Sequence, residues 1–185
     1  MKLNPESEYI DIFAREILTA ARTAPKAKGQ DDLITALLDE SDTEKLAVAM
    51  EEIADTRNEK FQFFKRDAKN VRDSDSVILI GLKSSKALNL DCGACGFDTC
   101  ADMLQYIQEG TSGTSDFTGP RCSIKFVDLG IAVGAATAKA KDLCIDNRVM
   151  YTIGVAAKNS GLIDADMVYG LPLSIKGRNI YFDRK

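Results

Sequence analysis

The sequence predicts a mixed α+β domain whose first half is rich in helices. Apolar residues recur at helical spacing through most of residues 5–72, which is typical of amphipathic helices packed on a core. Two later runs favour strands: residues 77–82 are continuously apolar and indicate a buried strand, and residues 167–173 are expected to form another. Between these runs, residues 91–122 hold four of the five cysteines. We interpret this segment as an insert within a single domain of residues 1–185.

The first helix is expected to begin near the N-terminus. Asn4 can cap it, Pro5 suits its first position, and its apolar face extends to Ala21. Pro25 ends the pattern, and residues 26–29 resemble a loop. Further helices are predicted at residues 33–38, 42–54 and 61–71.

The second half alternates between helices and strands. Helices are predicted at residues 99–109, 124–140 and 155–158, and strands at residues 77–82, 149–153, 167–173 and 180–182. Small residues dominate residues 131–140, which indicates a helix closely surrounded by other backbone. Residues 176–179 are expected to form a turn.

Composition restricts the class of protein. The hydrophobic content of 45% and charged content of 28% are those of an ordinary soluble globular chain. The net charge of −4 argues against nucleic acid or an anionic membrane as partner. No apolar run approaches the roughly 20 residues that span a bilayer, and residues 1–6 lack the apolar stretch of a signal peptide. We therefore expect a cytoplasmic protein whose cysteines are thiols or metal ligands, not disulfides.

The absence of histidine restricts the chemistry further. The sequence has no His, which excludes Ser-His, Cys-His and His-metal sites. Proton transfer would need a carboxylate, Lys, Tyr, Cys, water or a cofactor. No residue stands out among these, so the sequence identifies no catalytic group.

Four cysteines form the most specific motif in the chain. Three lie close together and the fourth is distant, in the order Cys92, Cys95, Cys100 and Cys122. Three clustered ligands with one remote ligand are common in ferredoxins that hold a [4Fe–4S] cluster. Gly93 and Gly96 allow the tight backbone that such a loop needs. The pattern predicts a [4Fe–4S] cluster on these four thiols.

Other uses of the thiols stay open at this point. Zinc is one alternative, although structural zinc sites usually pair two short knuckles and this chain has one Cys-x2-Cys. Redox-active or simply buried thiols are another. Cys100 is expected in the first turn of its helix, where the helix dipole favours negative charge. Cys144 is expected to be a small buried hydrophobe in a helix, not a ligand.

The motif also resembles known proteins. The residues from Cys92 to Ala101, with Cys122 downstream, are similar to the four-cysteine iron–sulfur module of corrinoid iron–sulfur proteins. The whole chain resembles a family of uncharacterised ferredoxin-domain proteins from anaerobic bacteria and archaea. Three stretches carry that likeness: Ala20–Gly29, the cysteine-rich residues 91–122 and Gly170–Arg184.

This resemblance implies a nitroreductase-like α+β fold, with a central, mostly antiparallel sheet flanked by helices. It also implies an intertwined homodimer with flavin at the subunit interface. The residues that then lie near FMN are Ala24, Pro25, Lys28 and Gly29 in the first loop, and Lys176 and Arg178 near the C-terminus. The chain lacks the Arg-Arg-Ser segment of nitroreductases, and Lys26 replaces the serine of their Ala-Pro-Ser loop. The alternative is that the four cationic side chains are solvated loop charges: Lys26, Lys28, Lys176 and Arg178.

Three functions are consistent with these observations. The first is a [4Fe–4S] electron-transfer protein that exchanges electrons with a redox partner protein or a small-molecule acceptor. The second is an FMN-dependent oxidoreductase that uses the cluster as an electron relay. The third is a structural or sensing role, in which zinc or a cluster orders the insert.

Overall fold

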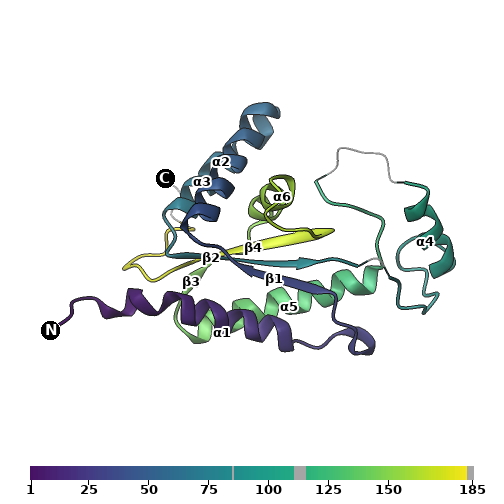
Figure 1. The fold of residues 1–185 in the computed structure, drawn as a ribbon, viewed down its shortest axis with the longest axis horizontal. Helices are drawn as coiled ribbons and strands as arrows, with labels where there is room; N and C mark the ends of the chain where they lie inside the picture. The colour runs from purple at the N-terminus through teal and green to yellow at the C-terminus, as the bar shows by residue number, and fades with distance from the viewer. Residues whose placement is uncertain (85, 111–115, 183–185) are drawn as a thin grey trace.

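The computed structural model describes residues 1–84, 86–110 and 116–182 (Figure 1). Its centre is a four-stranded sheet in the order β1-β2-β4-β3, with every neighbouring pair antiparallel. The strands are β1 (Leu33–Leu37), β2 (Ser76–Leu82), β3 (Asp146–Asn147) and β4 (Met167–Ser174). The predicted α+β class with a central antiparallel sheet is confirmed.

Helices cover both faces of the sheet (Figure 1). On one face lie α1 (Ile10–Thr23) and α5 (Ser123–Asp142), and on the other lie α2 (Glu40–Thr56), α3 (Phe63–Arg72) and α6 (Tyr151–Asn159). Short 3-10 turns are η1 (Pro5–Tyr9), η2 (Ala27–Gly29) and η3 (Glu59–Phe61). The remaining helix, α4 (Cys100–Gln108), lies beyond one end of the sheet. Within the described ranges, no helix is both long and apolar enough to cross a membrane.

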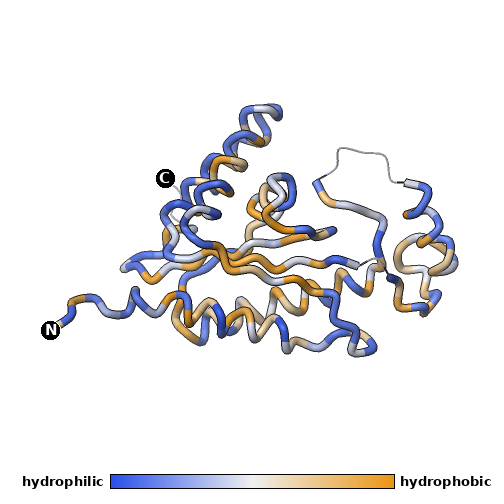
Figure 2. The backbone as a smooth tube through the Cα atoms, in the orientation of Figure 1, coloured by the Kyte–Doolittle hydropathy of each residue, from blue (hydrophilic) through white to orange (hydrophobic). Residues whose placement is uncertain are grey.

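The central strand shows why the core has two halves. All seven residues of β2 are buried. Val77 and Leu79 pack with α2, α3 and α6, whereas Ile78, Ile80 and Leu82 pack with α1 and α5. Side chains alternate across a strand, so a strand covered on both faces is continuously apolar. Figure 2 shows hydrophobic residues along the strands, with hydrophobic and hydrophilic residues alternating along the helices.

Two glycines allow α6 to lie directly on β4. A Cβ atom added at Gly154 would lie 1.8 Å from the carbonyl oxygen of Val168. One added at Gly170 would lie 1.9 Å from Cγ2 of Ile153. No side chain fits at either position, so the close helix–strand contact requires both glycines.

The long predicted elements are confirmed, and three short ones are wrong. The helix predicted at residues 33–38 is wrong: Leu33–Leu37 form β1, because their backbone pairs with β2. One helix, α6, covers residues 151–159 in place of most of the expected strand at 149–153 and of the helix at 155–158, and Met150 before it makes an isolated antiparallel bridge to Gly170. Residues 180–182 form a turn instead of a strand, and there the buried Tyr181 hydroxyl lies 2.9 Å from the Ser74 hydroxyl.

Cys144 also differs from its prediction. It is exposed and lies just beyond the end of α5, with a φ of 58°. It therefore occupies the left-handed position that commonly ends a helix, not the helix interior. Residues 111–115 of the predicted insert, and Asp183 and Arg184 of the third family-like stretch, lie outside the described residues.

Candidate metal and cofactor site

The chain leaves the sheet after Leu82 and packs against the sheet again through α5. We call residues 83–122 the cysteine segment. The carboxylate of Asp166 binds both of its ends: Ser84 donates its backbone N–H over 2.9 Å, and Arg121 donates a guanidinium N–H over 2.8 Å. The Arg121 and Asp166 side chains are only 11% and 13% exposed. One ion pair therefore closes the base of the cysteine segment.

Three of the four motif cysteines belong to, or pack against, one apolar cluster. Cys100 and Cys122 are buried in it, and Cys95 packs against it partly buried. Cys92 is exposed and precedes Cys95 in the same loop. The other buried members are Ala87, Leu88 and Met103. In the described part of the chain, no three His, Cys, Asp or Glu side chains are close enough together to hold a metal ion.

Both buried cysteines lie at helix N-termini. Cys100 is the first residue of α4, whose cap is the Thr99 hydroxyl, 3.1 Å from the backbone nitrogen of Asp102. The Cys100 N–H donates to the Asp91 carboxylate over 2.7 Å. Cys122 directly precedes α5. Helix N-termini carry partial positive charge, so both positions suit a thiolate-bound anionic group.

Hydrogen bonds draw the distant cysteine to the loop. Gly93 and Gly96 have φ values of 70° and 87°, and the Gly96 N–H donates to the Gly93 carbonyl over 2.9 Å. The Ser123 hydroxyl, next to Cys122, donates to the Ala94 carbonyl over 2.9 Å. The segment therefore fits an iron–sulfur cluster in three respects: an all-thiol donor set, apolar surroundings and a tight glycine loop.

The predicted flavin loop lies beside the cysteine segment. Ala24 is buried at the end of α1, and Pro25 follows it. The Lys28 ammonium donates to the Leu88 carbonyl over 2.8 Å, and Ala27 packs against the cysteine cluster. Gly29 has a φ of 64°. The family resemblance implies that Lys28 lies near a flavin, and in the structure its ammonium group binds the backbone carbonyl of Leu88.

A buried ion cluster behind that loop was not predicted. The Lys125 ammonium is 1% exposed and lies 2.7 Å from the Gln30 carbonyl and 2.8 Å from the Asp32 carboxylate. Asp128, also buried, accepts the Ala27 N–H over 3.0 Å. The available signal was a Lys and an Asp three residues apart on a helix that is otherwise mostly apolar. These groups fix the loop against α5.

The second predicted flavin group lies elsewhere. β2 and β4 are antiparallel, so Leu82 and Met167 are at one end of the sheet, near the cysteine segment, and Ser174 is at the other. Lys176 follows Ser174, donates to the Asp73 carbonyl and lies 3.4 Å from the Asp75 carboxylate. Within one chain, the loop at residues 24–29 and the turn containing Lys176 and Arg178 are thus at opposite ends of the sheet.

A second polar group joins the cysteine segment to α6 and was also missed. Asp116 accepts hydrogen bonds from Arg57 and from the Tyr151 hydroxyl. Burial, followed by this bond to Asp116, raises the pKa of Tyr151 to about 12. The bond from Arg57, followed by that from Tyr151, lowers the pKa of Asp116 despite its burial. Residues this far apart in sequence give no local pattern that links them.

The fold defined by these elements is that of the nitroreductases. Similar structures are B. megaterium NfrA2 (TM-score 0.53, 12% identity, 91% of this chain and 59% of that one) and a Vibrio harveyi NADPH:FMN oxidoreductase complexed with NAD+ (0.53, 12%, 91% and 61%). A nitroreductase with bound FMN from Desulfitobacterium hafniense is also similar (0.57, 14%, 91% and 79%). The chain spans about three fifths of the first two proteins. At these identities the likeness shows the fold alone.

Sequence comparison identifies the family. Residues 118–184 match a family described as "Uncharacterized protein containing a ferredoxin domain (DUF2148)". A protein from Archaeoglobus fulgidus is 42% identical over 179 residues, which cover 97% of this chain and 94% of that protein. The chain belongs to this ferredoxin-domain family, as the resemblance in its sequence predicted.

Proposed function

We propose that this protein transfers electrons through a [4Fe–4S] cluster bound by Cys92, Cys95, Cys100 and Cys122. The observation that carries the proposal is the burial of Cys100 and Cys122, far apart in sequence, in one apolar cluster with Cys95 against it. Membership of a ferredoxin-domain family and a fold shared with oxidoreductases support an electron-transfer role. Bound cluster would supply one-electron chemistry.

The protein residues around the thiols have distinct tasks in this proposal. Leu88 and Met103 exclude water from the buried side. Asp91 and Ser123 hold the loop against the two helix N-termini through their hydrogen bonds. Cys92 is exposed, so its side of the site is where a redox partner protein or a small acceptor can approach.

Metal analysis tests the proposal directly. Protein prepared without oxygen is expected to contain about four irons and four sulfides per chain, as a cubane cluster requires. Zinc without sulfide would contradict it and would favour a structural metal. Loss of bound iron with unchanged electron transfer would contradict the redox role and leave an ordering or sensing role.

A second candidate is an FMN-dependent oxidoreductase that uses the cluster as a relay. It is favoured by the fold, because a similar structure contains bound FMN. A flavin that contacts both the loop at residues 24–29 and the turn at Lys176 and Arg178 requires two chains, since these lie at opposite ends of one chain's sheet. The outer face of α5 suits such a homodimer: Val127 and Ile131 are 55% and 41% exposed, and Gly130 and Gly134 keep it flat.

Two measurements test this candidate. FMN added to the metal-loaded protein is expected to bind at one molecule per chain. Flavin that stays unbound would contradict the hypothesis of an FMN-dependent oxidoreductase. Gly134→Arg is expected to convert a dimer into a monomer, because it places a large charged side chain on the flat outer face of α5. The fold of the single chain should tolerate the change, because nothing outside α5 lies within 4 Å of a Cβ added at Gly134. Val48→Arg, on the exposed side of α2, is the matched control and leaves a dimer intact.

A further inference from the structure

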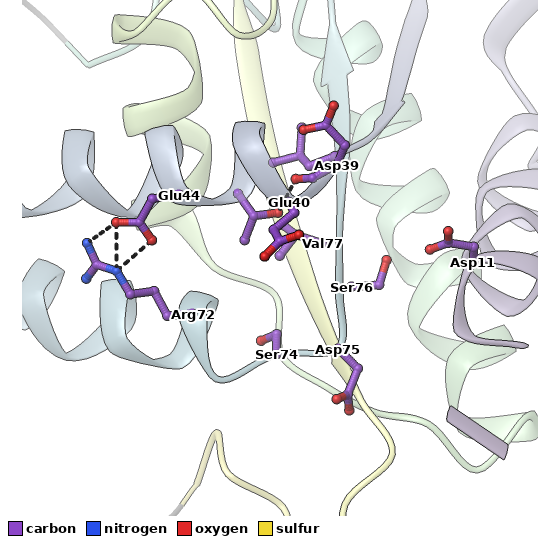
Figure 3. Close-up of a pocket in the computed structure, with 11 residues that line it drawn as sticks. Asp11, Asp39, Glu40, Glu44, Arg72, Ser74, Asp75, Ser76 and Val77 are labelled. Atoms are coloured by element: carbon purple, nitrogen blue, oxygen red, sulfur yellow. Dashed lines mark hydrogen bonds and ion pairs between the residues drawn. The ribbon is translucent and has the colours of Figure 1, made fainter. Parts of the chain in front are cut away.

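A cavity of about 680 Å³ lies at the end of the sheet opposite the cysteine segment (Figure 3). It is bounded by α1, the start of α2 and the turn from α3 into β2. Its volume is within the range of about 300–1,000 Å³ that is typical of small-molecule sites. The lining residues that matter here are Asp11, Leu38, Asp39, Glu40, Ser76 and Val77.

The charge of this cavity favours a cation. Its one basic lining residue, Arg72, already binds the carboxylates of Glu44 and Glu51. The carboxylates of Asp11 and Glu40 have no hydrogen-bond or ion-pair partner in the described chain. They come from two different helices and lie on either side of Ser76 in Figure 3.

Ser76 gives an independent indication of a ligand. Its side chain is 9% exposed and lines the cavity, yet its hydroxyl oxygen has no hydrogen-bond partner in the described chain. A buried hydroxyl without a partner costs about 1–3 kcal/mol. A ligand N–H in the cavity would supply the missing bond.

The shape and lining distinguish an organic cation from a metal ion. The carboxylates do not converge: no group of three metal-binding side chains occurs in the part of the chain that the structure describes. Leu38 and Val77 add buried apolar wall between the polar groups. Hydrated or chelated metal ions gain nothing from such a wall, whereas methylene groups do.

We propose that this cavity binds an aliphatic amine with more than one ammonium group, a small polyamine. Its ammonium groups pair with Asp11 and Glu40, one of them donates to the Ser76 hydroxyl, and its methylene chain packs on Leu38. The site is distant from the cysteines, so its occupancy is independent of the metal content and of the proposed function.

Calorimetric titration of the full chain with 1,4-diaminobutane at fixed ionic strength tests this proposal. One saturable site per chain is expected, with no heat from the neutral isostere 1,4-butanediol. Absence of binding would overturn the proposal. An equal response to magnesium chloride would overturn it as well, because it would show non-specific charge screening.

Variants locate the site. Asp11→Asn and Glu40→Gln are each expected to weaken 1,4-diaminobutane binding roughly tenfold, the size of one charge-assisted hydrogen bond. Ser76→Ala is expected to weaken binding without lowering the stability of the unliganded protein, because it removes an unpaired polar atom. Ser174→Ala, which removes another buried unpaired hydroxyl outside the cavity, is the matched control. Unchanged affinity in the Asp11→Asn, Glu40→Gln double variant would show that the amine binds elsewhere.

Discussion

The sheet with its helical layers and the cysteine segment are stabilised in different ways. The sheet carries a large apolar cluster on each face. The cysteine segment has one small cluster, in which two of the five buried members are cysteines, and it depends on a few hydrogen bonds to the rest of the chain. Apolar burial on both faces therefore stabilises the sheet, whereas the cysteine segment depends more on individual hydrogen bonds.

Glycines show the same contrast. In the sheet region, Gly154 and Gly170 are required because a neighbouring group occupies the place of a Cβ atom. In the cysteine segment, Gly93 and Gly96 have open space around them and are required for their positive φ values. The first pair serves packing and the second serves the loop conformation.

The largest expected effect is on the proposed iron–sulfur cluster. Cys95→Ser is expected to remove the cluster almost completely and to accelerate amide hydrogen exchange in α4, while exchange in β2 and β4 stays unchanged. Iron analysis and hydrogen-exchange mass spectrometry measure both. Cys144→Ser, at an exposed position outside the segment, is the control. Equal iron loss in both variants would show that the ligand assignment is wrong.

The sheet region is expected to be most sensitive at Gly154. Gly154→Ala places a methyl group against the Val168 carbonyl and should destabilise the protein by about 3 kcal/mol or more. The matched change Gly134→Ala, on the open face of α5, should be neutral or stabilise by up to about 1 kcal/mol. Urea denaturation of both variants provides the comparison. Similar losses would mean that α6 does not contact β4 this closely.

The connection between the two regions is expected to weaken when Asp166 is neutralised. Asp166→Asn leaves the Arg121 guanidinium without its counter-charge and should cost about 2 kcal/mol. Asp164→Asn, whose carboxylate pairs with Lys83 at an exposed site, is the control and should change stability by less than about 1 kcal/mol. Chemical denaturation measures both, and an equal cost would contradict a special role for Asp166.

The smallest expected effect is on alkaline stability at Tyr151. The pKa of this tyrosine is raised from 10.0 to about 12 in the folded chain. The contribution of the protonated tyrosine to the free energy of unfolding is therefore complete below pH 10 and is lost as the pH rises towards 12. Wild-type protein should therefore lose stability faster than Tyr151→Phe across this window. Urea midpoints at pH 9, 10 and 11 measure the difference. The exposed Tyr9→Phe is the control, and a parallel decline in all three proteins would contradict the prediction.

The sequence predicted the elements whose own residues carry a clear apolar pattern, either a helical period or a continuous run of strand length. The buried strand at residues 77–82 and the helix at 42–54 are examples, because each is specified by its own apolar pattern. Residues 33–38 failed because a short apolar run fits helix and strand alike, and only pairing with β2 decides between them. Residues 149–153 failed because contact with β4 determines the helix there.

The candidate site was predictable to a similar degree. The cysteine motif identified the thiols, since its spacing lies within one stretch of sequence. The Lys125 ion cluster, the Asp116 contacts and the orphan hydroxyl of Ser76 depend on residues brought together from distant parts of the chain. No local pattern encodes such contacts, so they become visible only in the folded molecule.

The contacts of Asp166 at both ends of the cysteine segment bear on how the segment could have been acquired. Asp166 binds one residue from each end of the cysteine segment, so the segment starts and finishes at one point on the sheet. A closed loop of this kind can change length at little entropic cost and without shifting the register of the strands. We expect that residues 86–120 could be exchanged for a short turn with the sheet preserved. A scaffold built in this way can gain or lose the whole cysteine segment through a single continuous insertion or deletion in its gene.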